Sequence, residues 1–210
     1  HEGYFDTALE HLSSAVRLSR TGSASIREGL AVNVIGEIRA IRGAYDRACH
    51  AANRVKEHLS EQGEFRLNAG AELVHGLASL GRGNPADAAS RFRSALERGR
   101  EHGIGWVEVS TLGHLGLTRL LQERPEIGLE RLGEACDLAG RRDEVRWSIA
   151  FDAFYAATNG ESNAERALDA ALQRATEHDL EPISDAIRVL MGRETKGPET
   201  LHSVVANRLV

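Results

Sequence analysis

The sequence predicts an all-α fold in which antiparallel helix pairs stack into a solenoid. The chain repeats with a period of forty residues, one helical position in successive copies is glycine, and the prolines stand at helix starts. A repeat of this length is typical of solenoids, in which each unit buries its apolar face against its neighbours. Three columns of small or apolar residues carry the repeat: Ala8, Ala48, Ala88, Gly128 and Leu168; Leu12, Ala52, Phe92, Leu132 and Leu172; and Ala15, Val55, Ala95, Ala135 and Ala175.

The two helices of each pair carry different columns. The three columns above follow one another at steps of four and three residues, which places them on one face of the second helix. The first helix carries a glycine column, Gly36, Gly76 and Gly116, which becomes Ala156 in the next copy. A glycine within a helix costs about 1 kcal/mol relative to alanine, so helix propensity does not explain this column. We expect two helices to approach closely there.

Glycines and prolines set the helix boundaries. Glycine allows the backbone of a tight turn, and proline is tolerated just inside a helix start because the N–H that it lacks would be unpaired there. The residues concerned are Gly43 and Gly83 for the turns, Asn84 as an N-cap, and Pro85, Pro125, Pro182 and Pro198 for the helix starts. The predicted helices cover residues 4–19, 23–42, 44–61, 65–81, 85–101, 105–122, 125–140, 144–158, 162–178, 182–193 and 198–208.

The repeat also predicts the domain organisation. We expect an array of about five units over residues 1–193, whose first unit is truncated because the pattern begins in the second half of a repeat. Residues 194–210 break the register, and we expect them to form a C-terminal capping helix or, as the less favoured alternative, a helix that docks onto a partner. Because the chain opens with a histidine and its one methionine is Met191, we expect it to be a piece of a longer polypeptide.

The repeat resembles the tetratricopeptide repeat (TPR) over residues 3–175. Its period exceeds the usual one of about 34 residues by about six, and the tryptophan, tyrosine and closing proline of the family are not kept. Such long repeats are similar to the sensor regions of bacterial signal-transducing ATPase regulators. HEAT repeats share the length, but their helix-one proline is absent. The resemblance implies a right-handed superhelix, and its best copies are Gly36, Gly43, Tyr45, Ala48, Ala52 and Val55, followed by Gly76, Gly83, Ala88, Phe92 and Ala95.

Composition and charge disfavour several function classes. No apolar run approaches the roughly 18 residues that a membrane helix needs, so we expect a soluble, cytoplasmic protein with no membrane partner. The net charge of -5 argues against a broad nucleic-acid surface. The two cysteines, Cys49 and Cys136, stand in different columns, which disfavours a disulfide and favours a reducing compartment.

The sequence contains no recognisable catalytic or metal-binding motif. Histidine pairs at i, i+4, CxxC pairs, nucleophile elbows and phosphate-binding loops are all missing, so we expect no enzymatic activity and no cofactor. An aromatic stripe, Trp147, Phe151, Phe154 and Tyr155, has two interpretations. Packing between repeats is favoured over a cage for an aromatic ligand.

The resemblance further implies that the first helix of each pair lines the concave, partner-binding side of the superhelix. By register that side is mostly leucine and alanine, which suits an amphipathic helix or an extended hydrophobic peptide. The equally weighted alternative is that the long repeats curl tightly and bury these leucines against one another. The predicted binding residues are Asn33, Glu37, Leu73, Leu77, Leu80, His114, Leu117 and Leu120.

Two functions follow from this pattern. The chain is expected to be a non-enzymatic scaffold that binds a protein, a peptide segment or another domain of a larger bacterial regulatory protein. The alternative is a sensor in which a small-molecule or peptide effector occupies the concave face, with Asn33, Glu37 and His114 as polar contacts. Sequence-specific RNA reading is disfavoured, because polar reading positions do not recur in every unit.

The glycine column generates the first testable prediction. Gly116→Leu should overpack the contact between two helices and lower the free energy of unfolding by about 1 to 3 kcal/mol. Denaturation followed by circular dichroism would measure this change. An unchanged melting temperature would mean that the assumed register is wrong.

Overall fold

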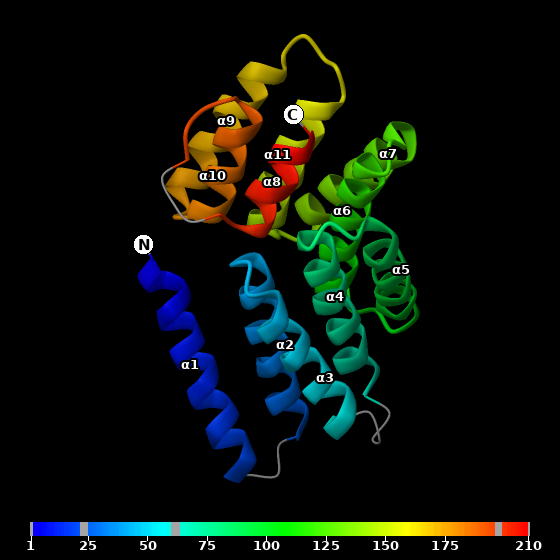
Figure 1. The fold of residues 1–210 in the computed structure, drawn as a ribbon, viewed down its shortest axis with the longest axis vertical. Coiled ribbons are helices and arrows are strands. Elements are labelled where there is room, and N and C mark those ends of the chain that lie inside the picture. The colour runs from blue at the N-terminus through cyan, green and yellow to red at the C-terminus, as the bar shows by residue number, and fades with distance from the viewer. Residues whose placement is uncertain (1, 22–24, 60–63, 196–198, 210) are drawn as a thin grey trace. The chain divides into compact units, whose positions relative to one another are not determined.

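The computed structural model describes residues 2–21, 25–59, 64–195 and 199–209, and all of its regular elements are α-helices (Figure 1). Neighbouring helices pack in sequence, as expected for a helical array. The helices are α1 (Glu2–Thr21), α2 (Ser25–Ile41), α3 (Tyr45–Leu59), α4 (Phe65–Gly81), α5 (Pro85–Glu101), α6 (Gly105–Leu121), α7 (Pro125–Arg141), α8 (Val145–Thr158), α9 (Ala164–Glu177), α10 (Glu181–Leu190) and α11 (Leu201–Leu209).

The chain forms two compact units, His1–Val107 and Glu108–Val210. In unit 1, α2 pairs with α3 and α4 with α5, while the first helices α2 and α4 also touch each other. In unit 2, α7 packs on α8, α8 on α9, and α10 on both α8 and α9. Within unit 1, α4 therefore packs on both helices of the preceding pair, and within unit 2, α10 does the same.

The glycine column lies at close contacts between helices. A Cβ atom placed on Gly76 would lie 2.5 Å from the ring of Phe92 on α5, and one on Gly116 would lie 2.9 Å from the carbonyl oxygen of Gly128 on α7. At Gly36 the nearest atom is a methyl group of Val74 on the next first helix, 3.0 Å away. The expected close approach is thus confirmed, but its partner differs from copy to copy.

The second helices bury the three repeat columns. Every column member on α3, α5 and α7 is buried, including Ala48, Phe92 and Leu132. On α1 the same columns remain partly exposed, as at Leu12 and Ala15. The apolar face that the period predicts is therefore the packed face of α3, α5 and α7.

The turns within the pairs close in a recurrent way. The second residue after the first helix adopts a left-handed conformation, and the next amide donates back to a carbonyl of the last helical turn. At Gly83 φ is 78°, and the amide of Asn84 donates to the carbonyl of Ser79 at 2.9 Å. Gly43 has φ 75°, whereas in the third copy the same position is Glu123 with φ 56°. Between pairs, left-handed residues recur at Gly103, Asp143 and Asp179.

The predicted boundaries agree with the observed ones to within three residues wherever both are described. Asn84 caps α5 by accepting a hydrogen bond from the amide of Asp87 at 3.2 Å. The largest difference is the end of α10, at Leu190, because Gly192 has φ 66° and Arg193 donates back to Arg188. The boundaries predicted at 23, 61 and 198, and Pro198 itself, lie outside the described residues.

The left-handed turn at Glu123 generates a second prediction. A non-glycine residue in the left-handed conformation destabilises the folded state by about 1 to 2 kcal/mol. Glycine avoids this strain, but its larger conformational entropy in the unfolded state offsets part of the gain. Glu123→Gly should therefore raise the free energy of unfolding by about 0.5 to 1 kcal/mol, measured by chemical denaturation. The matched control Glu123→Ala removes the same carboxylate but should give no such gain. If both variants raised the free energy of unfolding equally, the effect would come from loss of the Glu123 carboxylate charge and not from the backbone conformation.

Candidate functional site

The structure buries almost all of the predicted binding residues. In unit 1, Asn33, Glu37, Leu73, Leu77 and Leu80 are all buried. In unit 2, His114 and Leu117 are buried, and Leu120 is half-buried with its side chain over Gly128. Of the two alternatives for the leucines, the structure supports burial in a closed core. A role for these side chains in binding stays a prediction.

Asn33 joins two first helices of unit 1. Its side-chain amide donates to the backbone carbonyl of Leu67 at 2.9 Å, while its carbonyl oxygen is buried without a hydrogen-bond partner. Gly70 on α4 makes room for it, because a Cβ there would lie 2.5 Å from Asn33 Nδ2. This geometry makes Asn33 a structural link between α2 and α4.

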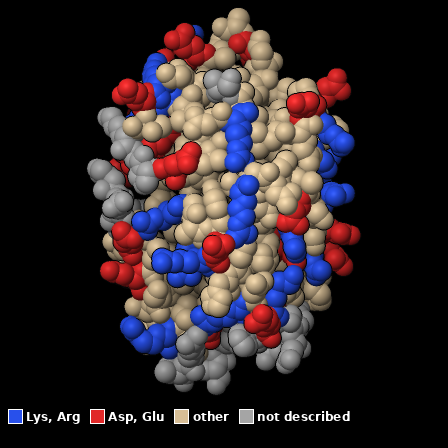
Figure 2. Space-filling view, viewed as in Figure 1, with Lys and Arg blue, Asp and Glu red and all other residues tan. Residues whose placement is uncertain are grey.

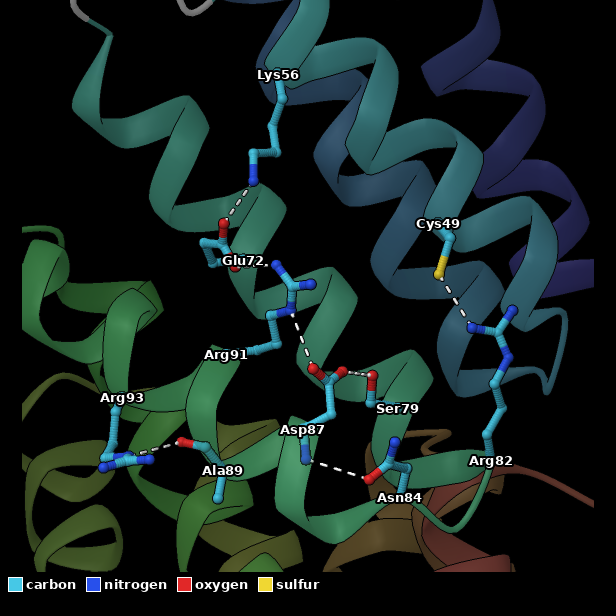
Figure 3. Close-up of polar contacts among 10 residues, drawn as sticks. All are labelled: Cys49, Lys56, Glu72, Ser79, Arg82, Asn84, Asp87, Ala89, Arg91 and Arg93. Atoms are coloured by element: carbon cyan, nitrogen blue, oxygen red, sulfur yellow. Dashed lines mark hydrogen bonds and ion pairs between the residues drawn. The ribbon is translucent and has the colours of Figure 1, made fainter.

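A polar network covers one face of α3, α4 and α5 (Figure 3). The carboxylate of Glu72 accepts hydrogen bonds from Lys56 Nζ at 2.7 Å and from Arg91 at 3.2 Å. Asp87 lies 3.6 Å from Arg91 and accepts from the Ser79 hydroxyl at 2.5 Å. Burial alone would raise the pKa of Glu72, but the hydrogen bonds from Lys56 and Arg91 outweigh it and hold this pKa below its ordinary value. The network is internally neutralised, so it stabilises the unit and leaves no free charge for a ligand.

Both cysteines are free thiols with half-buried side chains. Cys49 Sγ lies 3.4 Å from a guanidinium nitrogen of Arg82 (Figure 3). Arg82 also pairs with Asp46. Burial, with help from Asp152, raises the pKa of the Cys136 thiol. Cys136 is therefore held as a thiol and not as a reactive thiolate.

The most unusual feature of unit 2 is a group of five buried aromatic and imidazole side chains, which we call the histidine–aromatic cluster. Its members are His114 on α6, Trp147, Phe151 and Phe154 on α8, and His202 on α11. Trp147 and Phe151 are stacked with ring centroids 5.3 Å apart, and His114 meets both rings edge-on. Gly113 leaves room for Phe151, because a Cβ there would collide with its ring. The aromatic stripe thus packs between helices, as favoured.

The two histidines form a directed chain of hydrogen bonds. His114 Nδ1 lies 2.7 Å from the backbone carbonyl oxygen of Ser110, so this nitrogen carries a proton and donates it. His114 Nε2 is then the acceptor for the Nε2–H of His202, 3.2 Å away. The remaining nitrogen, His202 Nδ1, is buried and has no hydrogen-bond partner. In this arrangement both imidazoles are neutral.

Electrostatics also keep the pair neutral. Burial lowers the pKa of His114 to about 4, helped by the positive charge of Arg146 and opposed by the hydrogen bond to Ser110. Burial, the neighbouring His114 and Arg146 lower the pKa of His202 as well. Arg146 lies with its guanidinium carbon 4.1 Å from the centroid of the Trp147 ring.

The last helix, α11, contacts helices that lie earlier in the chain than its neighbour α10. Its residue His202 contacts His114 of α6 and Trp147 and Phe154 of α8, and α11 also packs on α10. In Figure 1 it lies along α8 and α10. A helix that only closed the end of the array would touch the last helices alone. The forty-residue register gave no indication of the His114–His202 pair, because residues 194–210 lie outside it.

One hollow of the surface lies in unit 2. It has a volume of about 390 Å³ and lies between the ends of α8, α9, α10 and α11. Among the described residues no group of three or more histidine, cysteine or acidic side chains is placed to hold a metal ion. Basic and acidic side chains are interspersed among uncharged ones on the face in Figure 2, the pattern of a solvated surface. The residues that line the hollow are Ala157, Thr158, Ala164, Glu165, Leu168, Leu190, Met191, Arg193 and Leu209.

Comparisons with known proteins do not assign the chain to a family. No family model matches it, and a search of curated proteins finds no significant relative. Within the described part of the chain, no helix has the length and apolar character needed to cross a bilayer.

The burial of the predicted leucines generates a third prediction. Leu77→Asp should destabilise the protein by about 3 to 5 kcal/mol, because it removes a fully buried apolar side chain and places a charge in its position. Val34→Asp is the matched control on a first helix of the same unit, since Val34 is 40% exposed. Thermal denaturation should separate the two variants clearly. Similar melting temperatures would mean that Leu77 faces solvent.

Proposed function

We propose that this chain is a non-enzymatic scaffold of helical repeats that binds a helical protein segment on the face formed by α6, α8 and α10. The observation that supports this most is the seating of α11, which lies on that face with His202 against His114. A helix of the chain's own sequence thus occupies the kind of surface that was expected to accept an amphipathic helix. The TPR-like, right-handed superhelical form is part of this proposal.

The buried side of α11 indicates the chemistry of a ligand helix. Leu201 and Val205, and likewise His202 and Ala206, are buried at i, i+4 spacing, whereas Asn207 is exposed. A competing helix would present apolar side chains at these positions and a neutral hydrogen-bond donor opposite His114 Nε2. Helix-in-groove recognition uses this pattern of anchors.

The wider context of the scaffold follows from the same proposal. We place it in a larger bacterial regulatory protein in the cytoplasm, with a protein segment or another domain of the parent chain as its partner. We expect no nucleic-acid partner, because basic side chains are mixed with acidic ones on the face shown in Figure 2.

The alternative, an effector-sensing role, is supported by the hollow of about 390 Å³ at the end of α8, α9, α10 and α11. Its lining includes the charged side chains of Glu165 and Arg193. Asn33, Glu37 and His114, the polar contacts predicted for an effector, are not part of that lining. The scaffold role is therefore preferred.

A peptide competition experiment tests the scaffold proposal. Leu201→Asp/Val205→Asp in the full chain should displace α11, because both side chains are fully buried. A fluorescent peptide with the sequence of residues 199–210 should then bind this variant, measured by fluorescence anisotropy. The unchanged protein, whose face is occupied by α11 at high effective concentration, should bind it at least tenfold more weakly.

Two controls make the outcome decisive. Asn207→Asp adds one charge to the exposed side of α11 and should behave like the unchanged protein. The same peptide carrying Val205→Asp should not bind the displaced variant. The proposal fails if the displaced variant remains folded by circular dichroism but binds no peptide. It also fails if the variant unfolds, because α11 would then be an integral part of the core.

A further inference from the structure

We propose that α11 is a proton-sensitive latch, which stays docked while His114 and His202 are both neutral and leaves the face of α6, α8 and α10 on mild acidification. The release of α11 on acidification is argued from the hydrogen bonds, the burial and the charges around the two imidazoles. Only its consequence, that release uncovers a surface for a partner, rests on the proposed function.

The hydrogen-bond chain has no place for an additional proton. A proton added to His114 Nε2 would replace the acceptor of the His202 bond with a second donor, 3.2 Å away. A proton added to His202 Nδ1 would lie in a buried position where no acceptor is in reach. Either charge would be fully buried, with the like charge of Arg146 nearby, which is far more costly than burial of a neutral imidazole.

The charged groups on the surrounding helices do not compensate for such a proton. The carboxylates of these helices have other partners. Glu108 of α6 pairs with Arg142 at 3.0 Å, and Asp152 of α8 pairs with Arg174 at 3.3 Å. On α10, Asp185 and Glu181 both pair with Arg188, at 2.7 Å and 3.8 Å. On α11 itself the charged side chain is that of Arg208. The positive charge of Arg146 disfavours protonation of both imidazoles, and a charge on His114 would also disfavour protonation of His202.

The hydrogen bonds at the start of α11 allow the helix to dissociate from its neighbours while it stays helical. It is a nine-residue helix with its own N-terminal cap: the amide of Thr200 donates to Ser203 Oγ at 2.8 Å, and the amide of Ser203 donates to Thr200 Oγ1 at 3.4 Å. These bonds hold the helix start without help from α6 or α8. Release therefore breaks the contacts of the helix with its neighbours and leaves its cap intact.

The direction of the pH effect follows from linkage. His202 leaves with α11, and a released histidine has an ordinary pKa of about 6.5. Burial in the docked state lowers the pKa of His202 well below that value. Docking is therefore fully favoured above about pH 6.5 and is lost as the pH falls below it. One excluded proton makes the opening constant rise by up to about tenfold per pH unit in this range.

Amide hydrogen exchange of the full chain tests the latch. Between pH 7 and pH 5, after correction for intrinsic exchange rates, the protection factors of α11 should fall about twentyfold. Those of α8 and α4 should stay unchanged. In the double variant His114→Leu/His202→Leu, which keeps the side-chain volume and removes both titrating groups, α11 should stay protected at pH 5. The matched control His178→Leu changes an exposed histidine of the same unit and should keep the full pH response.

A second measurement on the unchanged protein does not depend on the folding of any variant. NMR titration of the imidazole carbons should show the two cluster histidines becoming protonated only as α11 loses protection. The latch is ruled out if α11 keeps its protection while both histidines titrate, if its protection does not change with pH, or if all of unit 2 loses protection together with α11. No peptide is involved, so failure here leaves the scaffold proposal standing, and failure of peptide binding leaves the latch standing.

Discussion

Helices in this chain can pack only as closely as the residues between them allow, and the small residues that recur every forty positions set that distance. At Gly116 the backbone of α7 comes so near that even a methyl group would meet the Gly128 carbonyl oxygen. The same helix, α6, leaves room at Gly113 for the ring of Phe151, and one residue further on it presents His114 to α8 and α11. The position of the histidine–aromatic cluster therefore depends on the absence of side chains beside it.

Two buried polar centres in the protein are stabilised in opposite ways. Glu72 keeps its charge because Lys56 and Arg91 supply hydrogen bonds that outweigh the cost of burial. His114 and His202 avoid charge, because a proton on His114 Nε2 would remove the acceptor of the His202 hydrogen bond and a proton on His202 Nδ1 would be buried without a hydrogen-bond partner. The first centre tolerates a change of pH around neutrality without rearranging. The second makes the docking of one helix conditional on proton concentration.

The sequence positions of prolines, glycines and apolar columns predicted most helix boundaries, but they did not predict the contacts between residues far apart in the chain. Pro85 and Pro125 fix the starts of α5 and α7 because proline fits a first helical turn and no later one. The left-handed turn at Glu123 carries no compositional signal of its own and was visible only as the forty-residue copy of Gly83. The apolar residues of the first helices left burial and an open groove as equal alternatives, and the structure buries Leu77. Nothing in the sequence joins His114 to His202, eighty-eight residues apart.

The placement of the tryptophans has a practical consequence. The sequence contains two, and they are divided between the compact units: Trp106 in unit 1 and Trp147 in unit 2. Trp147 is 2% exposed, with an imidazole edge-on to its ring. Replacing one indole with phenylalanine would leave a single intrinsic fluorophore in the other unit. The emission of each unit could then be followed separately without an added dye, and Trp147 would report on the surroundings of the cluster itself.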